Sequence, residues 1–158
     1  NIISNDNNEA RDFAVLASST KLLRNIDILY RQRTNEQTEI TFISNETLER
    51  LKQIHQVTDE KAANWKFNRD FEALERTRKQ LFTTDKRCLK ISTIQSFKGW
   101  ESPSVIVILE NDIVLHNTTF RPMSPQTIYT AITRARENMY IINIGNDTYH
   151  NFFYNQTL

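Results

Sequence analysis

Short apolar runs recur along the chain and are separated by longer stretches of mixed polarity. Most of the runs are rich in β-branched residues and only five to seven residues long, as expected of buried strands. We expect strands at 13–18, 39–44, 89–94, 104–110 and 139–145. Because these runs carry apolar residues at consecutive positions, both of their faces should be covered, as in a parallel sheet between helices.

Between the runs, apolar residues return every three or four positions, which indicates amphipathic helices. The expected helices lie at 21–33, 46–55, 68–82 and 125–137, and the aromatic tail 147–156 should form a short helix that packs back. In the first helix Leu22, Ile26 and Leu29 form the apolar stripe. Ser124 followed by Pro125 marks the start of the fourth, as a cap before proline at the first helical position.

Strands that alternate with helices predict an α/β fold with three layers, in which a mostly parallel sheet is flanked by helices. A chain of 158 residues is long enough for one such domain, and we take 1–158 as that domain with a short, helical, basic insert at about 56–88. Ligands of such sheets gather beyond the carboxyl ends of the strands.

Composition and charge narrow the class of protein. The net charge is +1, and no apolar run approaches the roughly 18 residues needed to span a bilayer. The single cysteine, Cys88, excludes an internal disulfide and a multi-cysteine zinc site, and it favours a reducing, cytoplasmic setting. The three histidines are far apart in the sequence, so we expect no metal site. Glu110 and Asp112 leave open a magnesium-binding carboxylate, although a solvated loop is favoured.

Glycine is nearly absent, and this excludes one mode of nucleotide binding. Gly99 and Gly145 are the only glycines, so neither GxxxxGK[ST] nor GxGxxG can be present. The chain therefore lacks its own phosphate loop, and any nucleotide must be held mainly by another domain. Because the chain opens at Asn1 rather than at methionine, we expect it to be a piece of a longer protein.

The expected helix at 125–137 carries Arg134 on a face that differs from its apolar stripe, with Thr127 and Thr130. A guanidinium group held in this way suits phosphate, since it donates in pairs and keeps its charge. Most arginines at such positions are simply solvated, so this feature alone does not assign a function.

Two segments together resemble a known family. IYTAITRAREN (128–138) resembles the last motif of superfamily 1 helicases of the UvrD/Rep type, and STIQSFKGWES (92–102) resembles the motif before it. FAVLASST (13–20) and ITFISNETLERLKQI (40–54) are similar to earlier parts of the same domain. The resemblance implies the second, C-terminal RecA-like domain of an ATP-driven DNA helicase.

The resemblance also implies roles for single residues. Arg134 would be the arginine finger that reaches the γ-phosphate, and Glu101 would contact the ribose, with Gly99 and Lys98 beside it on the nucleotide side; Lys98 is left open between phosphate contact, strand contact and a structural role. The residues expected along single-stranded DNA are Thr93, Gln95 and Ser96.

The partners follow from the same resemblance. ATP with Mg²⁺ would be bound mainly by the N-terminal RecA-like domain, which this chain lacks, and the polynucleotide would be single-stranded DNA, with RNA as an alternative. Alone, the chain should be inactive as an ATP hydrolase.

Three departures from the family pattern are visible. Ser18 stands where an arginine is usual, so Arg11, Lys21 or Arg24 would substitute for it, or a single finger suffices. Gln95 replaces a histidine. The insert at 44–88 is far shorter than the helical subdomain of UvrD-type proteins. These departures keep a rival hypothesis open, namely a degenerate, non-enzymatic module that binds nucleic acid or a protein.

The middle of the chain is basic and aromatic. Residues 61–98 hold ten Lys/Arg against four Asp/Glu, with Trp65, Phe67, Phe71 and Phe82 among them. Such a stretch could meet a polyanion, but a solvated helix face with a buried aromatic stripe is the favoured interpretation. Trp100 could stack on a base, and core packing is the favoured interpretation.

Overall fold

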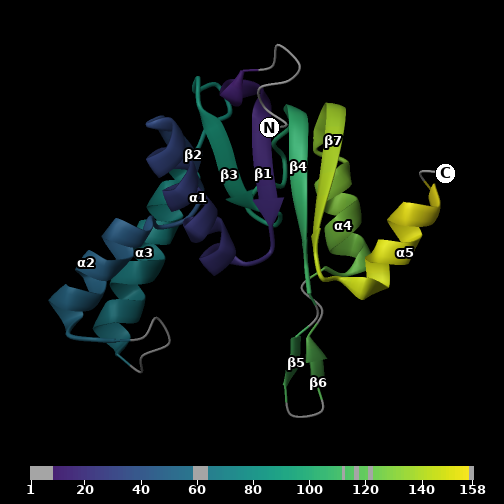
Figure 1. The fold of residues 1–158 in the computed structure, drawn as a ribbon. Coiled ribbons are helices and arrows are strands. Elements are labelled where there is room, and N and C mark those ends of the chain that lie inside the picture. The colour runs from purple at the N-terminus through teal and green to yellow at the C-terminus, as the bar shows by residue number, and fades with distance from the viewer. Residues whose placement is uncertain (1–8, 59–63, 112, 116–117, 121–122, 157–158) are drawn as a thin grey trace.

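A five-stranded sheet forms the centre of the computed structural model, which describes residues 9–58, 64–111, 113–115, 118–120 and 123–156. The strand order is β2-β3-β1-β4-β7 and every pair is parallel. The strands are β1 (Phe13–Ala17), β2 (Thr38–Ile40), β3 (Leu89–Thr93), β4 (Ser102–Glu110) and β7 (Ala135–Ile144). The α/β class and the parallel sheet predicted from the sequence are confirmed (Figure 1).

Helices cover both faces of this sheet (Figure 1). On one face α1 (Thr20–Thr34) packs with Phe13, Val15 and Ile91, and on the other α4 (Pro125–Ile132) and α5 (Asp147–Gln156) pack against Leu16, Val107 and Leu109. Beyond β2, α2 (Asn45–His55) and α3 (Trp65–Leu81) pair into a hairpin with a small core of its own. A 3-10 turn (Ala10–Asp12) precedes β1, and β5 (Ile113–Leu115) pairs antiparallel with β6 (Thr118–Phe120).

Four helices begin at a side-chain cap. The oxygens of Ser19, Ser44, Asn64 and Ser124 each accept from a backbone N–H in the first turn of the helix that follows, which satisfies a donor that would otherwise lack a partner. Pro125 occupies the first helical position after Ser124, as the sequence predicts.

The buried stripe of α1 differs from the predicted one. Leu29 is 52% exposed, and the residues that the helix buries are Leu23, Arg24 and Asp27. Burial of the two charged groups is possible because both have partners: Arg24 donates from Nε to the Ile43 carbonyl at 2.9 Å, and Asp27 accepts from Arg31 at 2.7 Å. Leu22 and Ile26 of the predicted stripe do pack against the core but are only partly buried, so the buried face of α1 is rotated from the predicted stripe toward Leu23, Arg24 and Asp27.

The helix predicted at 125–137 is too long. α4 ends at Ile132, and β7 begins at Ala135, four residues before the predicted strand. The reason is the parallel pairing with β4, where Ala135 lies opposite Ser102 and Asn138 opposite Ser104. Arg134 thus lies in the turn between α4 and β7, and the prediction that it sits on the helix is wrong.

The basic stretch forms a mostly exposed helix. Phe67 is the one residue that α3 buries fully, and Phe82, just after it, is also buried. Leu74 and Leu81 are 36% and 66% exposed, and Trp65 is 65% exposed. Trp100 packs edge-on against Phe82 with ring centroids 5.6 Å apart, which confirms its contact with the core. None of the described helices is long and apolar enough to cross a membrane.

Candidate functional site

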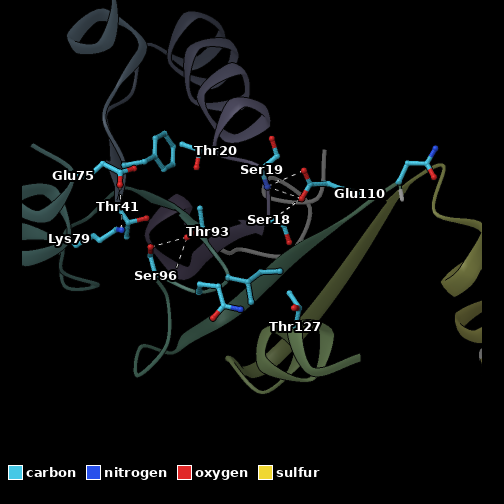
Figure 2. A pocket seen from close by; sticks show the side chains of 14 residues that line it. Ser18, Ser19, Thr20, Thr41, Glu75, Lys79, Thr93, Ser96, Glu110 and Thr127 are labelled. Atoms are coloured by element: carbon cyan, nitrogen blue, oxygen red, sulfur yellow. Dashed lines mark hydrogen bonds and ion pairs between the residues drawn. The ribbon is translucent and has the colours of Figure 1, made fainter. Parts of the chain in front are cut away.

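A pocket of about 900 Å³ opens at the carboxyl edge of the sheet, where β1, β2, β3 and β4 end (Figure 2). The three residues predicted to lie along the nucleic-acid strand, Thr93, Gln95 and Ser96, all line it. Thr93 closes β3, and its Oγ1 accepts from the Ser96 backbone N–H at 3.2 Å and donates to Ser96 Oγ at 2.9 Å. The turn after β3 is therefore held against the pocket by its own hydroxyl groups.

Hydroxyl groups dominate the rest of the lining. These hydroxyl groups come from residues near the ends of the strands and the starts of α1 and α4, namely Ser18, Ser19, Thr20, Thr41 and Thr127. The charged lining residues that Figure 2 labels are Glu110 and, from α3, the ion pair of Glu75 and Lys79. Glu75 and Lys79 lie 3.7 Å apart across one helical turn. A lining of this kind offers many hydrogen bonds, and its two carboxylates and one ammonium group leave a small negative charge.

The turn from β1 into α1 is closed to phosphate by a carboxylate of the chain itself. Glu110, the last residue of β4, accepts from the backbone N–H groups of Ser18 and Ser19, the latter at 2.9 Å (Figure 2). A helix N-terminus after a strand is where anions bind in phosphate-loop proteins. Here Glu110 occupies that place, so the open possibility that it is a magnesium ligand is replaced by a capping role; Asp112 lies outside the described residues.

The predicted nucleotide-side residues lie at the opposite, amino edge of the sheet. Gly99 and Glu101 line a second hollow of about 370 Å³ just before β4, together with Arg11, Lys90 and Arg136. Lys98 is exposed and precedes this hollow along the chain. Three cations and two carboxylates, Glu101 and Asp85, therefore share this edge, whereas the pocket at the carboxyl edge has one cation and two carboxylates.

Arg134 is held next to this hollow by three hydrogen bonds. Its guanidinium donates from Nε to the Thr130 carbonyl at 3.1 Å, from Nη1 to the Trp100 carbonyl at 3.4 Å, and from Nη2 to Thr133 Oγ1 at 3.0 Å. The Thr130 contact satisfies a carbonyl at the end of α4. Because a guanidinium carries five N–H groups, one on each terminal nitrogen remains for a further acceptor.

A backbone hydrogen bond brings the segments of Glu101 and Arg134, both predicted to contact the nucleotide, next to each other. The N–H of Ser102 donates to the Arg134 carbonyl at 3.0 Å, so Glu101 and Arg134, 33 positions apart, meet at the start of the β4–β7 pairing. The structure thus places Arg134 beside the segment that carries Gly99 and Glu101, and away from Thr93, Gln95 and Ser96.

One connection joins the two edges. Residues 94–101 run from the end of β3 to the start of β4 through consecutive turns, with the Phe97 N–H bonded to the Thr93 carbonyl and the Trp100 N–H to the Phe97 carbonyl, each at 3.0 Å. Phe97 is fully buried, and Gly99 takes the left-handed φ of +86° that its turn requires. We call residues 94–101 the crossover connection.

The structure narrows the search for a cation that replaces the arginine expected at Ser18. Arg24 is buried and bonded to the Ile43 carbonyl, and Lys21 is exposed on the first turn of α1. Only Arg11, of the three candidates, lines the hollow that contains Glu101. Burial lowers the pKa of the neighbouring Lys90 below its ordinary value, and its Nζ donates to the Arg11 carbonyl, which holds the 3-10 turn at this edge.

Sequence reasoning missed two residues that organise the carboxyl edge. The sequence pattern at Glu110 indicates a solvated loop or a magnesium ligand, although an acid at the end of a buried strand is also well placed to face a helix start. Asn146 is 1% exposed and accepts from the Tyr149 N–H at 3.2 Å, as a cap of α5. An asparagine directly before a helical tail was a signal that could have found it.

Five parallel strands with helices on both faces, and with polar loops at both edges, are consistent with a RecA-like domain. Residues 12–143 match the family model described as "Viral superfamily 1 RNA helicase core domain", and the chain belongs to that family. The match thus supports superfamily 1, and the family it names is an RNA helicase family rather than the UvrD/Rep type. No curated protein matches the chain. Superfamily 1 membership implies NTP-dependent helicase activity, with ATP and Mg²⁺, on nucleic acid.

Proposed function

We propose that this chain is the second motor domain of a superfamily 1 helicase, which supplies the arginine finger and part of a single-strand track while another domain cradles the nucleotide. One observation carries the proposal: the crossover connection reaches the hydroxyl-lined pocket at one end and the hollow beside Arg134 at the other. A contact between nucleotide and strand sites is what a motor needs to couple hydrolysis to movement.

Arg134 would act on the terminal phosphate of a nucleotide bound across the domain interface. Hydrolysis transfers the γ-phosphoryl group to water, and negative charge spreads over its equatorial oxygens in the transition state. The two N–H groups that remain on Nη1 and Nη2 are suited to pair with such oxygens while the other three hold the guanidinium in place. Glu101 would accept from the ribose hydroxyls.

The described residues would supply only some of the contacts that a bound nucleotide and its Mg²⁺ need. No group of three or more His, Cys, Asp or Glu that could hold a metal gathers within the described ranges, and Glu110 fills the β1–α1 turn. In the proposal, Mg²⁺ and most phosphate contacts therefore belong to an N-terminal RecA-like domain. The free thiol of Cys88 fits a reducing, cytoplasmic compartment.

The polynucleotide we propose is a single strand, read through its backbone at Thr93, Gln95 and Ser96. The motifs resemble those of UvrD/Rep-type DNA helicases, whereas the family description names RNA, and the hydroxyl-rich lining suits contacts to a 2′-OH. We therefore favour RNA. Competition between RNA and DNA oligonucleotides of one sequence tests this choice, and an equal or higher affinity for DNA would contradict it.

The finger assignment is tested by Arg134→Ala and Arg134→Lys in the intact protein. We expect kcat for ATP to fall by about 10³-fold or more in Arg134→Ala, with the Kd for ATP changed only a few-fold, since a finger acts on the transition state. Lysine should restore little because it cannot donate as a planar fork.

The matched control is Arg33→Ala, which removes an exposed arginine from the last turn of α1. Thermal unfolding of each variant separates a lost finger from a lost cap of α4. A kcat of Arg134→Ala within twofold of the wild type would rule out the finger role, and single-strand binding without any strand-stimulated hydrolysis in the intact protein would favour the non-enzymatic module.

A further inference from the structure

An exposed aromatic residue stands at the start of α3, outside the pocket. Trp65 is 65% exposed, although tryptophan is usually largely buried. The guanidinium carbon of Arg69 lies 5.4 Å and Lys66 Nζ lies 5.8 Å from the centre of its ring. Both cations are exposed. A largely exposed ring with two cations over it matches a base attached to a phosphate.

This ring lies on the same helical face as the wall of the pocket. Steps of three and four residues connect Trp65, Asn68, Glu72, Glu75 and Lys79, so these side chains form one stripe along α3. Glu75 and Lys79 line the pocket at the carboxyl edge. The stripe lies on a different face from Phe67, the residue through which α3 packs on the hairpin core. It therefore continues the pocket lining outward along the exposed side of the helix.

The length of the stripe sets its reach. From Lys79 to Trp65 the helix advances 14 residues, which is about 21 Å at 1.5 Å per residue. Figure 1 shows that α2 and α3 extend beyond the carboxyl edge of the sheet, so this distance leads away from the pocket. A strand that leaves the pocket along α3 would thus meet Trp65 several nucleotides later.

Charge along the stripe favours a polyanion. Arg69 and Arg76, one step of seven apart, flank the stripe, and Lys79 ends it; with Lys66 there are four cations against Asp70, Glu72 and Glu75. Arg69 pairs with Asp70 at 3.0 Å and Glu75 pairs with Lys79 at 3.7 Å. Lys66 and Arg76 are exposed and lie outside these two ion pairs, so they supply the excess of positive charge along the helix.

We propose that the exposed face of α3 extends the single-strand track from the pocket to Trp65, where an unpaired base stacks on the indole ring. This inference rests on the proposed function and adds to it a binding subsite and a specificity for unpaired bases. A single strand is favoured over a duplex because a ring that lies open on a helix surface can stack only on a base that is free of its own stack.

The test measures binding of the intact protein to a fluorescent oligonucleotide of about 12 nucleotides, within the site sizes that such tracks cover. We expect Trp65→Ala to raise the Kd about tenfold and Trp65→Phe to stay near the wild type, because phenylalanine keeps a stacking face. Leu81→Ala is the matched control: Leu81 is 66% exposed on the same helix, away from the stripe, and its loss should not change the Kd.

The contribution of positive charge to binding is tested by a second pair of variants, Arg76→Ala and Arg78→Ala. Arg76 flanks the stripe and Arg78 lies away from it, and both are exposed. For Arg76→Ala the slope of log K against log salt should become shallower by about 0.7, as for one lost phosphate contact to a single strand, whereas Arg78→Ala should leave the slope unchanged.

The outcomes separate this inference from the proposed function. An oligonucleotide of about 4 nucleotides, which the pocket alone can hold, should bind Trp65→Ala as it binds the wild type. If Gln95→Ala weakens binding of the long strand and Trp65→Ala does not, the α3 track is wrong and the pocket stands. If Gln95→Ala has no effect either, the strand side of the proposed function fails. An equal loss for duplex, or a change in the protein's own assembly without a change in Kd, would also overturn the track.

Discussion

The side-chain amide of Asn146 donates to the carbonyl oxygen of Glu110 at 2.7 Å, and so ties the start of α5 to the last residue of β4. The same side chain accepts from the Tyr149 N–H, while the Asn146 backbone exchanges hydrogen bonds with the side chain of Asn143. One buried residue therefore connects α5, β7 and the strand whose carboxylate caps α1.

We expect Asn146→Ala to lower the free energy of unfolding by about 1–3 kcal/mol, because a buried carbonyl and a helix start lose their partners together. Denaturant unfolding measures the loss, and hydrogen exchange should show reduced protection of the α5 amides. Asn151→Ala, on an exposed position of α5, is the control and should be near neutral. Unchanged protection of α5 in Asn146→Ala would contradict the role of this residue.

Phe97 anchors the crossover connection. Its side chain is fully buried and meets Phe82 edge-on with ring centroids 6.0 Å apart. Phe97→Ala should cost about 3–5 kcal/mol of unfolding free energy through the cavity it leaves. Phe97→Leu, which fills more of the space, should cost less, and Phe152→Ala, at a site 57% exposed, should cost little. A loss below 1 kcal/mol for Phe97→Ala would show that the connection is not pinned there.

Gly99 should resist substitution for backbone reasons alone. Its φ is +86°, and a Cβ built there meets nothing within 4 Å. Gly99→Ala should therefore cost about 1–2 kcal/mol from the left-handed backbone, and Gly99→Asn should cost less, since asparagine adopts that region more readily. Denaturant midpoints of the two variants measure the order. Equal stability of wild type and Gly99→Ala would mean that the turn rearranges freely.

The titration of Tyr30 should make the free energy of unfolding depend on pH in the alkaline range. Burial, and then the hydrogen bond that its phenol donates to Glu36, raise the pKa of Tyr30 to about 12. Because the folded-state pKa exceeds the ordinary value of 10.0, the contribution of this group is complete below pH 10 and is lost as the pH rises toward 12. Tyr30→Phe should lose less stability than the wild type over this interval. Absorbance titration of the folded protein should show one phenol that ionises late, and its absence would contradict the shift.

The chain alone should show no ATP turnover. It has no GxxxxGK[ST] segment, and Glu110 occupies the N–H groups at the β1–α1 turn. A phosphate-release assay on the purified 158-residue chain should therefore stay at background, with and without a single strand. Turnover that persists through further purification and disappears in Arg134→Ala would show that the chain carries a complete site.

Several features of the fold follow from local patterns. The strand runs, the caps at Ser19 and Ser124 and the order of the elements depend on residues that are adjacent in the sequence, so periodicity and turn chemistry could predict them. The placement of Thr93 near Ser18 at the sheet edge follows from the same logic, since the parallel strands β1 and β3 end together.

The remaining features depend on contacts between distant segments. The early end of α4 is set by pairing of Ala135 with Ser102, and the rotation of α1 by partners of Arg24 and Asp27. No periodicity within α1 or α4 contains that information, because tertiary contacts override local preference there. The role of Glu110 similarly requires two segments 91 residues apart to meet at Ser19.

The carboxylate of Glu110 has a consequence for how this fold responds to its solution. A helix start that lacks a partner gains stability from dissolved anions in proportion to their binding, and folding then depends on salt and ligand. Here the anion is covalently part of the chain, so its local concentration does not vary. Sulfate, phosphate or nucleotide should therefore leave the thermal stability of the β1–α1 turn unchanged, and the domain carries its own constant counter-ion through every state of a nucleotide cycle.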